Sequence, residues 1–171
     1  MNGFELTIIG ERINPGFKST RALFENSDLA GIQALAVRQA EAGAAYLNVN
    51  IGARAFTDPA FMAEVIRAIQ AVVRLPLSFD YPSRAVQALC LSCYDQERAG
   101  GQLPIVNSIT EHRWELMELR RVRPFKVIVM ASERVVDGVA AGNKTAADIA
   151  GTARRAALRL REEHGMAMHD I

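Results

Sequence analysis

The chain has 171 residues, enough for a single domain over 1–171; half of them are apolar and 23% are charged. These values are typical of a globular protein and exclude a disordered or fibrous chain. Twenty Lys and Arg against nineteen Asp and Glu give a net charge of +1, and this balance does not indicate a nucleic-acid partner. The apolar runs are too short to span a bilayer, the first residues lack a signal-peptide pattern, and two cysteines cannot form a disulfide framework. We therefore expect a reduced, cytoplasmic protein without a membrane partner.

Short apolar runs alternate with longer amphipathic segments along the chain. The apolar runs have the length of strands and lie at 6–10, 46–51, 75–80, 104–107 and 125–131. The amphipathic segments have apolar residues at helical spacing and lie at 28–43, 58–73, 83–99, 111–121 and 145–164. The segment 132–144 contains two glycines, and we predict a loop there.

Capping residues support several of these helix boundaries. Asp28 is a suitable N-cap, and Asp58 followed by Pro59 is a typical helix start. Gly43 is placed to end the first helix, and the pair Gly100–Gly101 is placed to end the third.

About five βα units in succession predict an α/β fold, with a parallel sheet and helices on the outside. The predicted strands are apolar on both faces, as buried parallel strands are. Two architectures fit this order: an open doubly wound sheet, or part of a (β/α)₈ barrel. No G-x-G-x-x-G motif follows the first strand, so the dinucleotide-binding version of the open sheet has no support.

Polar residues lie at the carboxyl ends of the predicted strands, where ligands gather in both architectures. Asn48 and Asn50 are two residues apart and share one face of their strand. Asp80 ends the third strand, and Asn107 ends the fourth. Helix capping explains any one such residue, but four at one rim favour a polar ligand.

The residue types indicate what the ligand is. Amides offer donors and acceptors, and one carboxylate accepts paired N–H groups, so the set suits a flat heterocycle with N–H and C=O edges. No Lys or Arg cluster indicates a phosphate site, and no Ser–His or Cys–His arrangement indicates a nucleophile. The C-x-x-C pair at Cys90 and Cys93 is interpreted as structural, because zinc needs four ligands; no metal site is predicted.

Four motifs together resemble the pterin-binding family: IGERIN (9–14), LNVNIG (47–52), SFD (78–80) and IVNS (105–108). The chain is most similar to methyltetrahydrofolate:corrinoid methyltransferases and to the folate domain of cobalamin-dependent methionine synthase, and more distantly to dihydropteroate synthase. The resemblance implies a (β/α)₈ TIM barrel that binds a pterin in its mouth. It also implies methyl transfer between methyltetrahydrofolate and a corrinoid, cobalamin, held on a partner protein.

The resemblance also implies roles for individual residues. Asp80 and Asn107 match the residues that hydrogen-bond the pyrimidine edge of the pterin, and Glu11 and Asn14 match the first-strand motif near the pocket. Asn48 stands where the family has an aspartate, a departure from its Asp-x-Asn pattern. Met130 can line the face of the pterin or pack in the core. The predicted pterin-binding residues are Glu11, Asn14, Asn48, Asn50, Asp80, Asn107, Ser108 and Met130.

The chain is shorter than the family's barrel, which needs about 250 residues. It stops after about five βα units, so a further pterin-binding aspartate and the asparagine that contacts N5 have no counterpart, and the catalytic residue is unknown. Two explanations stay open: more chain follows, or chains associate as a homo-oligomer, for example a homodimer, that covers the exposed sheet edges. Whether the chain alone is an active enzyme also stays open.

Two alternative functions remain. One is a non-catalytic module, a barrel fragment that binds pterin or assembles with itself. The other is an enzyme like dihydropteroate synthase, which ranks lower because the Lys and Arg that such enzymes use for pyrophosphate are missing here.

Overall fold

The computed structural model describes residues 6–171 as an α/β protein. Five strands form the main sheet and two more form a separate hairpin. The main strands are β1 (Ile9–Ile13), β2 (Tyr46–Val49), β3 (Leu77–Asp80), β4 (Ile105–Ile109) and β5 (Lys126–Val129), and the hairpin strands are β6 (Glu133–Val136) and β7 (Val139–Gly142). The helices are α1 (Lys18–Glu25), α2 (Leu29–Glu41), α3 (Arg54–Thr57), α4 (Pro59–Val72), α5 (Arg84–Cys93) and α6 (Ala146–Glu162), with 3₁₀ helices η1 (Trp114–Arg121) and η2 (Met168–Asp170).

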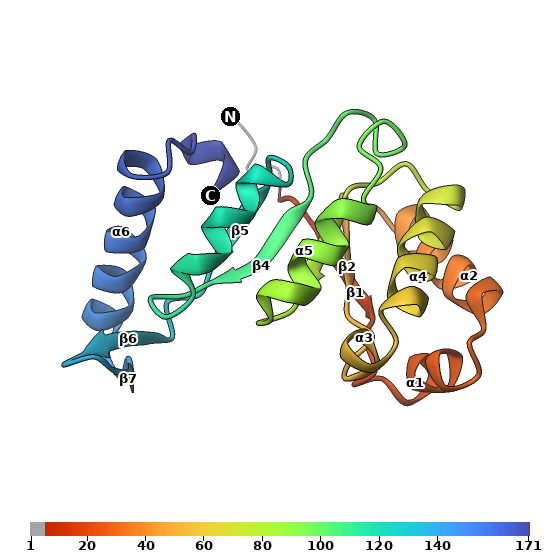
Figure 1. Cartoon of the computed structure of the whole chain (residues 1–171), viewed down its shortest axis with the longest axis horizontal. Coiled ribbons are helices and arrows are strands. Elements are labelled where there is room, and N and C mark those ends of the chain that lie inside the picture. Colours follow the sequence, from red (N-terminus) through yellow and green to blue (C-terminus); the bar gives the residue numbers. More distant parts are fainter. Residues whose placement is uncertain (1–5) are drawn as a thin grey trace.

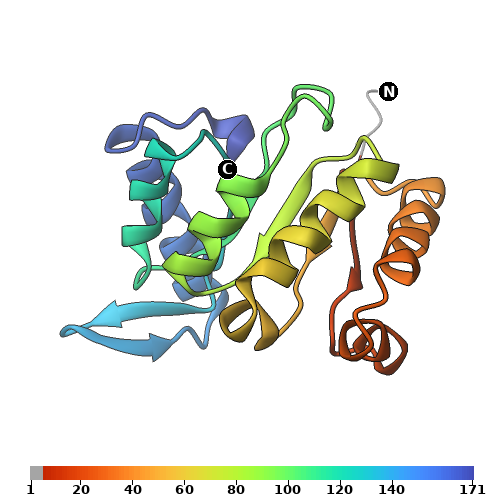
Figure 2. The ribbon, with the colours of Figure 1, turned by 45° about the vertical axis from the view of Figure 1, so that its right-hand side comes forward.

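The main sheet is parallel throughout and has the order β1-β2-β3-β4-β5. The connecting helices lie along one face of the sheet, and α6 stands beside η1 at the β5 end (Figures 1 and 2). This arrangement confirms a parallel βα fold. Over residues 6–171 the sheet stays open, with β1 and β5 at its edges, and it does not close into a barrel.

The hydrophobic core lies between the sheet and these helices. Leu47, Phe79 and Val106 occupy neighbouring strands and are fully buried against the helical layer. Helix α4 contributes Phe61, Met62, Val65, Ile66 and Ile69, which recur at helical spacing and are all buried. None of the helices within residues 6–171 is both long and apolar enough to cross a membrane.

The predicted N-caps Asp28 and Asp58 and the predicted helix end at Gly43 are confirmed. Asp28 accepts a hydrogen bond from the Gly31 N–H at 2.8 Å, and Asp58 accepts one from the Phe61 N–H at 3.1 Å. The chain leaves α2 through Gly43, whose φ of 91° belongs to the left-handed region that glycine adopts without strain. Local sequence chemistry therefore sets the boundaries of α2 and the start of α4.

Some boundaries differ from the predictions. Strand β1 covers residues 9–13 and not 6–10, and helix α1 lies in a segment for which no element was predicted. Helix α5 ends at Cys93, well before Gly100 and Gly101, because Tyr94 turns extended and its ring packs edge-on against Phe79 with the centroids 6.2 Å apart. Tertiary packing of one aromatic residue thus ends this helix.

The segment 132–144, predicted as a loop, forms the β6–β7 hairpin that projects at one end of the molecule (Figure 2). Its antiparallel strands carry Val135, Val136 and Val139, and its two-residue turn is Asp137–Gly138. Both turn residues have positive φ, 50° and 81°. An Asp-Gly turn between β-branched residues is a strong hairpin signal, so the sequence contained the information that the loop prediction overlooked.

Replacing Phe79, which is 0% exposed, with alanine should lower the free energy of unfolding by about 3–5 kcal/mol, because the cavity left in the core cannot refill. The matched control is Phe56→Ala, which removes the same ring at a site that is 56% exposed and should cost less than about 1 kcal/mol. Urea unfolding of both variants measures the difference, and equal losses would contradict this description of the core.

Candidate functional site

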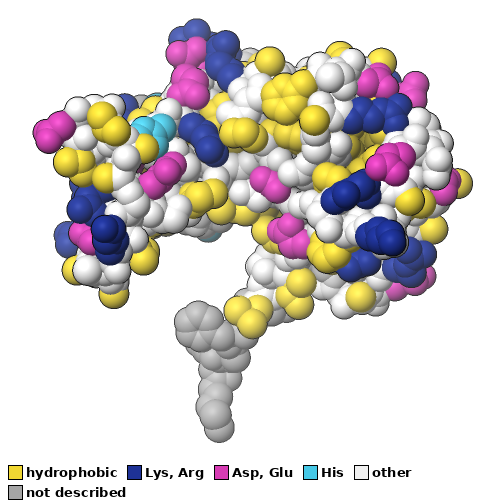
Figure 3. Space-filling model, turned by 90° about the horizontal axis from the view of Figure 1, so that it is seen from below, with side chains coloured by type: hydrophobic (Ala, Val, Ile, Leu, Met, Phe, Trp, Pro, Cys, Tyr) yellow, Lys and Arg dark blue, Asp and Glu magenta, His cyan; other side chains and the backbone are white. Residues whose placement is uncertain are grey.

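Three of the predicted site residues, Asn48, Asp80 and Asn107, lie with Ser78 on the face of the sheet that the helices leave free. Asn48 is in register with Ser78, and Asp80 is in register with Asn107. Residues in register on parallel strands, and residues two apart on one strand, point to the same face, so these four share one side of the sheet. Seen from below, the molecule is an arch around a hollow, and acidic side chains lie near its middle (Figure 3).

Asn48 is the buried centre of a chain of hydrogen bonds across this face, and its side chain is 0% exposed. Its Nδ2 donates to Glu11 Oε2 at 2.9 Å, and its Oδ1 accepts from Asn107 Nδ2 at 3.5 Å. Both ends of the amide are therefore used within the protein. An ionised aspartate in place of Asn48 could not donate a hydrogen bond to the Glu11 carboxylate on β1. An asparagine at this position therefore suits its neighbour.

Asn50 binds Asp80 directly. Its Nδ2 lies 3.2 Å from Asp80 Oδ2 and 3.1 Å from the Asp80 carbonyl oxygen, and its Oδ1 accepts from the Gly52 N–H at 2.7 Å. Among residues 6–171 no side chain donates to the other oxygen of the Asp80 carboxylate, Oδ1, so this atom can accept from a ligand. We call Glu11, Asn48, Asn50, Asp80 and Asn107 the polar cluster.

Two carboxyl groups influence each other in the polar cluster. The pKa of Glu11 lies above its ordinary value, first because partial burial disfavours the charged form and second because Asp80 is a nearby negative charge. The hydrogen bond from Asn48 acts in the opposite direction and favours the ionised form. The site thus combines two acidic groups with three amides. Because Asn48 and Asn50 are engaged within it, the remaining capacity to pair with the N–H and C=O groups of a ligand lies with Asp80 and Asn107.

The other three predicted residues are not hydrogen-bonded to the polar cluster in the part of the chain that the structure describes. Asn14 Oδ1 accepts from the Gly16 N–H at 2.8 Å and so stabilises the turn after β1. Ser108 follows Asn107 and is buried, and Met130 lies just after β5 with 41% of its surface exposed.

Ser78 is a candidate that the sequence reasoning missed. It is fully buried beside Asn48, on the same face as Asp80, and its Oγ has no hydrogen-bond partner among the described residues. Its place two residues before Asp80 in a strand was the signal, since that spacing puts both side chains on one face. It is the one residue of this face that offers a buried and unused hydroxyl within residues 6–171.

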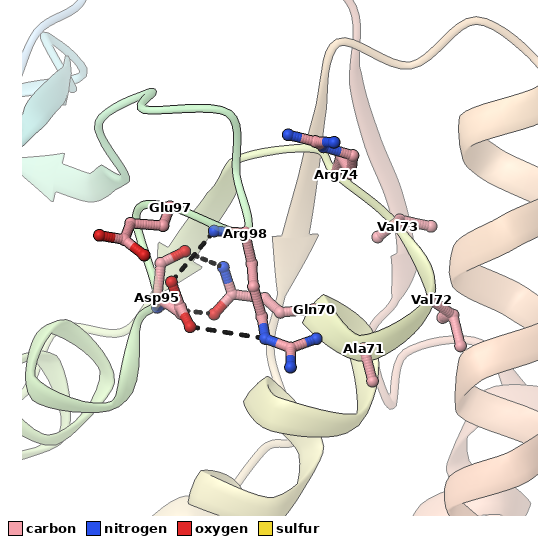
Figure 4. A pocket seen from close by; sticks show the side chains of 8 residues that line it. All are labelled: Gln70, Ala71, Val72, Val73, Arg74, Asp95, Glu97 and Arg98. Carbon is pink, nitrogen blue, oxygen red and sulfur yellow. Dashed lines mark hydrogen bonds and ion pairs between the residues drawn. The ribbon is translucent and has the colours of Figure 1, made fainter.

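A surface pocket at the opposite, amino end of the sheet does not compete with this site (Figure 4). Three of its polar residues bind one another: Gln70 exchanges two hydrogen bonds with the backbone of Asp95, and Asp95 pairs with Arg98 at 3.5 Å. Groups that already satisfy each other stabilise the fold and leave little for a ligand.

The structure also bears on metal and thiol chemistry. Within residues 6–171, no group of three or more His, Cys, Asp or Glu side chains is arranged to hold a metal ion. Cys90 and Cys93 are free, and burial raises the pKa of the Cys90 thiol. A thiol that stays protonated is a poor nucleophile, in agreement with the structural interpretation.

Comparison with known proteins gives one informative match. No family model matches the chain. Over 89 residues the chain is 33% identical to the methylcorrinoid:tetrahydrofolate methyltransferase of Eubacterium limosum. The aligned part is 50% of this chain and 33% of that relative, so the match spans about a third of the relative's length. The similarity supports a relationship to folate-related methyltransferases and nothing more specific.

The raised pKa of Glu11 predicts an effect on stability. An acid with a higher pKa in the folded chain binds protons more tightly there, so stability falls as the pH rises from 4.5 through that higher pKa. Glu11→Gln removes this charge and keeps an acceptor for Asn48, so it should raise the melting temperature at pH 7 by about 1–2 °C and give no gain near pH 4.

Thermal melts at the two pH values measure this difference. The matched control is Glu64→Gln on the exposed face of α4, which should show no such pH-dependent gain. A melting temperature of Glu11→Gln that is lower at pH 7 than that of the wild-type chain would show that the Glu11 charge stabilises the fold.

Proposed function

We propose that this chain is a pterin-binding component of a methyl-transfer system, acting between methyltetrahydrofolate and a corrinoid carried by a partner protein. The observation that carries the proposal is the polar cluster: two carboxylates and three amides, on or directly after four adjacent strands, gathered at the carboxyl ends of the sheet. The similarity to the relative from Eubacterium limosum supports the same assignment.

The cluster fits the chemistry of a pterin. The pyrimidine part of the pterin ring presents adjacent N–H donors, which suit the free oxygen of Asp80, and it also presents acceptors, which suit the amide of Asn107. A carboxylate paired with two N–H groups forms charge-assisted hydrogen bonds, which are stronger than neutral ones. Asn50 holds the Asp80 carboxylate in place, so we propose that it orients this acceptor for the ligand.

The role of the chain in the transfer itself is orientation. The corrinoid, when bound, would supply the methyl acceptor for transfer from the folate, or the methyl donor for transfer to it. N5 of the folate is a poor leaving group and needs a proton or a strong hydrogen bond as the methyl departs. The described residues would fix the ring and so the position of the methyl group.

A second candidate function is self-assembly with or without pterin binding, and the open sheet favours it. β1 and β5 are edge strands of a parallel sheet, a type of sheet that is normally covered on both faces. A homo-oligomer that covers these edges would elute well above 18.7 kDa in size-exclusion chromatography with light scattering.

Calorimetric titration with methyltetrahydrofolate tests the main proposal. The wild-type chain should bind with saturation. Asp80→Asn should weaken binding about 10- to 100-fold, since a hydrogen bond to a charged group is worth about 1.5–3 kcal/mol. Asn107→Ala should weaken it about 2- to 10-fold, since a hydrogen bond between neutral groups is worth about 0.5–1.5 kcal/mol.

The matched control for Asp80→Asn is Glu97→Gln, an acid-to-amide change at the exposed pocket on the opposite end of the sheet, and it should leave binding unchanged. If both site variants bind methyltetrahydrofolate as tightly as the wild-type chain does, the pterin does not bind at the polar cluster. No binding by a folded wild-type chain would reject the proposal for this chain on its own.

A further inference from the structure

A buried glutamine lies behind the polar cluster, in the helical layer. Gln87 is on α5, on the same side of the helix as the buried Cys90 and Leu91, and it is 0% exposed. Its Nε2 donates to the carbonyl oxygen of Phe79 at 2.8 Å and to that of Tyr81 at 2.9 Å. A third carbonyl oxygen, that of Asn107, lies 3.3 Å away.

The surrounding atoms fix the orientation of this amide. Three carbonyl oxygens gather around one end of the side chain, and only the NH₂ group can donate to them. The Oε1 atom at the other end has no partner among the described residues. A buried acceptor without a partner is unfavourable, so the bonds made by Nε2 must outweigh this cost for the side chain to stay inside.

The three carbonyl groups belong to the backbone that holds the ligand-binding side chains. Phe79 and Tyr81 flank Asp80 on both sides, and Asn107 is itself a member of the polar cluster. In addition, the Tyr81 N–H donates to the Asn107 carbonyl at 3.1 Å. One side chain thus ties together the ends of β3 and β4 where a carboxylate and an amide point to the opposite face.

We propose that Gln87 is a positioning residue of the pterin site: it fixes the spacing between Asp80 and Asn107 without touching the ligand. The inference rests on the proposed function for its ligand. Recognition of two adjacent groups on one flat ring depends on the distance between the two side chains, and that distance is set by the backbone that Gln87 holds.

Gln70 offers a matched control, because it is also a buried glutamine on a helix with backbone hydrogen bonds. It lies on α4, its Nε2 donates to the Asp95 carbonyl at 2.8 Å, and its Oε1 accepts from the Asp95 N–H at 2.9 Å (Figure 4). These bonds are at the amino end of the sheet, away from the polar cluster. Gln70→Met therefore removes the same chemistry without a connection to the site.

The experiment compares Gln87→Met and Gln70→Met in the full chain. Both should lower the melting temperature, because each removes buried hydrogen bonds. Only Gln87→Met should also weaken methyltetrahydrofolate binding, by about tenfold or more, as loss of a supporting residue behind binding groups does. In NMR spectra recorded without ligand, Gln87→Met should shift the side-chain NH₂ signals of Asn50 and Asn107. Gln70→Met should leave these signals unchanged.

Each other result has a defined meaning. Unchanged affinity and unchanged Asn50 and Asn107 signals in Gln87→Met would overturn the inference. If the wild-type chain does not bind methyltetrahydrofolate, the proposed function fails, and the NMR signals alone decide whether Gln87 positions these side chains. If Gln87→Met does not fold, the wild-type chain still tests the contact: the Gln87 NH₂ protons should exchange slowly with solvent, and fast exchange would overturn the inference.

Discussion

The candidate site depends on one constraint: the Asn48 amide is fully buried in the middle of a parallel sheet and must find its hydrogen bonds inside the protein. Glu11 on β1 accepts from one end of it and Asn107 on β4 donates to the other. Three strands are thereby linked through side chains as well as through their backbones. Removing either partner would leave a buried polar atom unsatisfied, so the carboxyl ends of these strands keep a defined arrangement before any ligand arrives.

A second set of contacts supports this arrangement from the helical side. Tyr81 follows Asp80, and its buried hydroxyl accepts a hydrogen bond from the backbone N–H of Ile51, next to Asn50. Burial raises the pKa of Tyr81 well above its ordinary value, so this hydroxyl stays protonated and can also donate toward the Met62 sulfur. Together with Gln87, which binds the backbone of β3 and β4 from the helical side, Tyr81 fixes the backbone near Asp80. The polar side chains on the opposite face of the sheet remain accessible to a ligand.

The sequence predicted those parts of this structure that local chemistry determines. Asp28 and Asp58 identified helix starts. Short apolar runs between amphipathic segments identified five parallel strands with polar residues at their ends. The bonds within the cluster were beyond prediction, because the pairing of Asn48 with Glu11 requires the register of β1 against β2, which residue spacing does not give. The end of α5 was also missed, since it depends on Tyr94 packing against Phe79 from a distant strand. Gln87 gave no signal, because a single glutamine in an amphipathic helix resembles a solvent-facing residue until its tertiary contacts are known.

The open sheet can recognise one edge of a ligand without surrounding the ligand. The polar cluster places its donors and acceptors on the free face, where a flat ring can be recognised along one edge. Seen from below, the molecule has a hollow that is open to solvent (Figure 3). Hydrogen bonds to a ligand gain most when water is excluded around them, and an uncovered ring keeps much of its surface in water. In the proposed function, Asp80 and Asn107 would select the edge of the ring that is recognised, and any polypeptide that closed over the ring would strengthen these hydrogen bonds by excluding water.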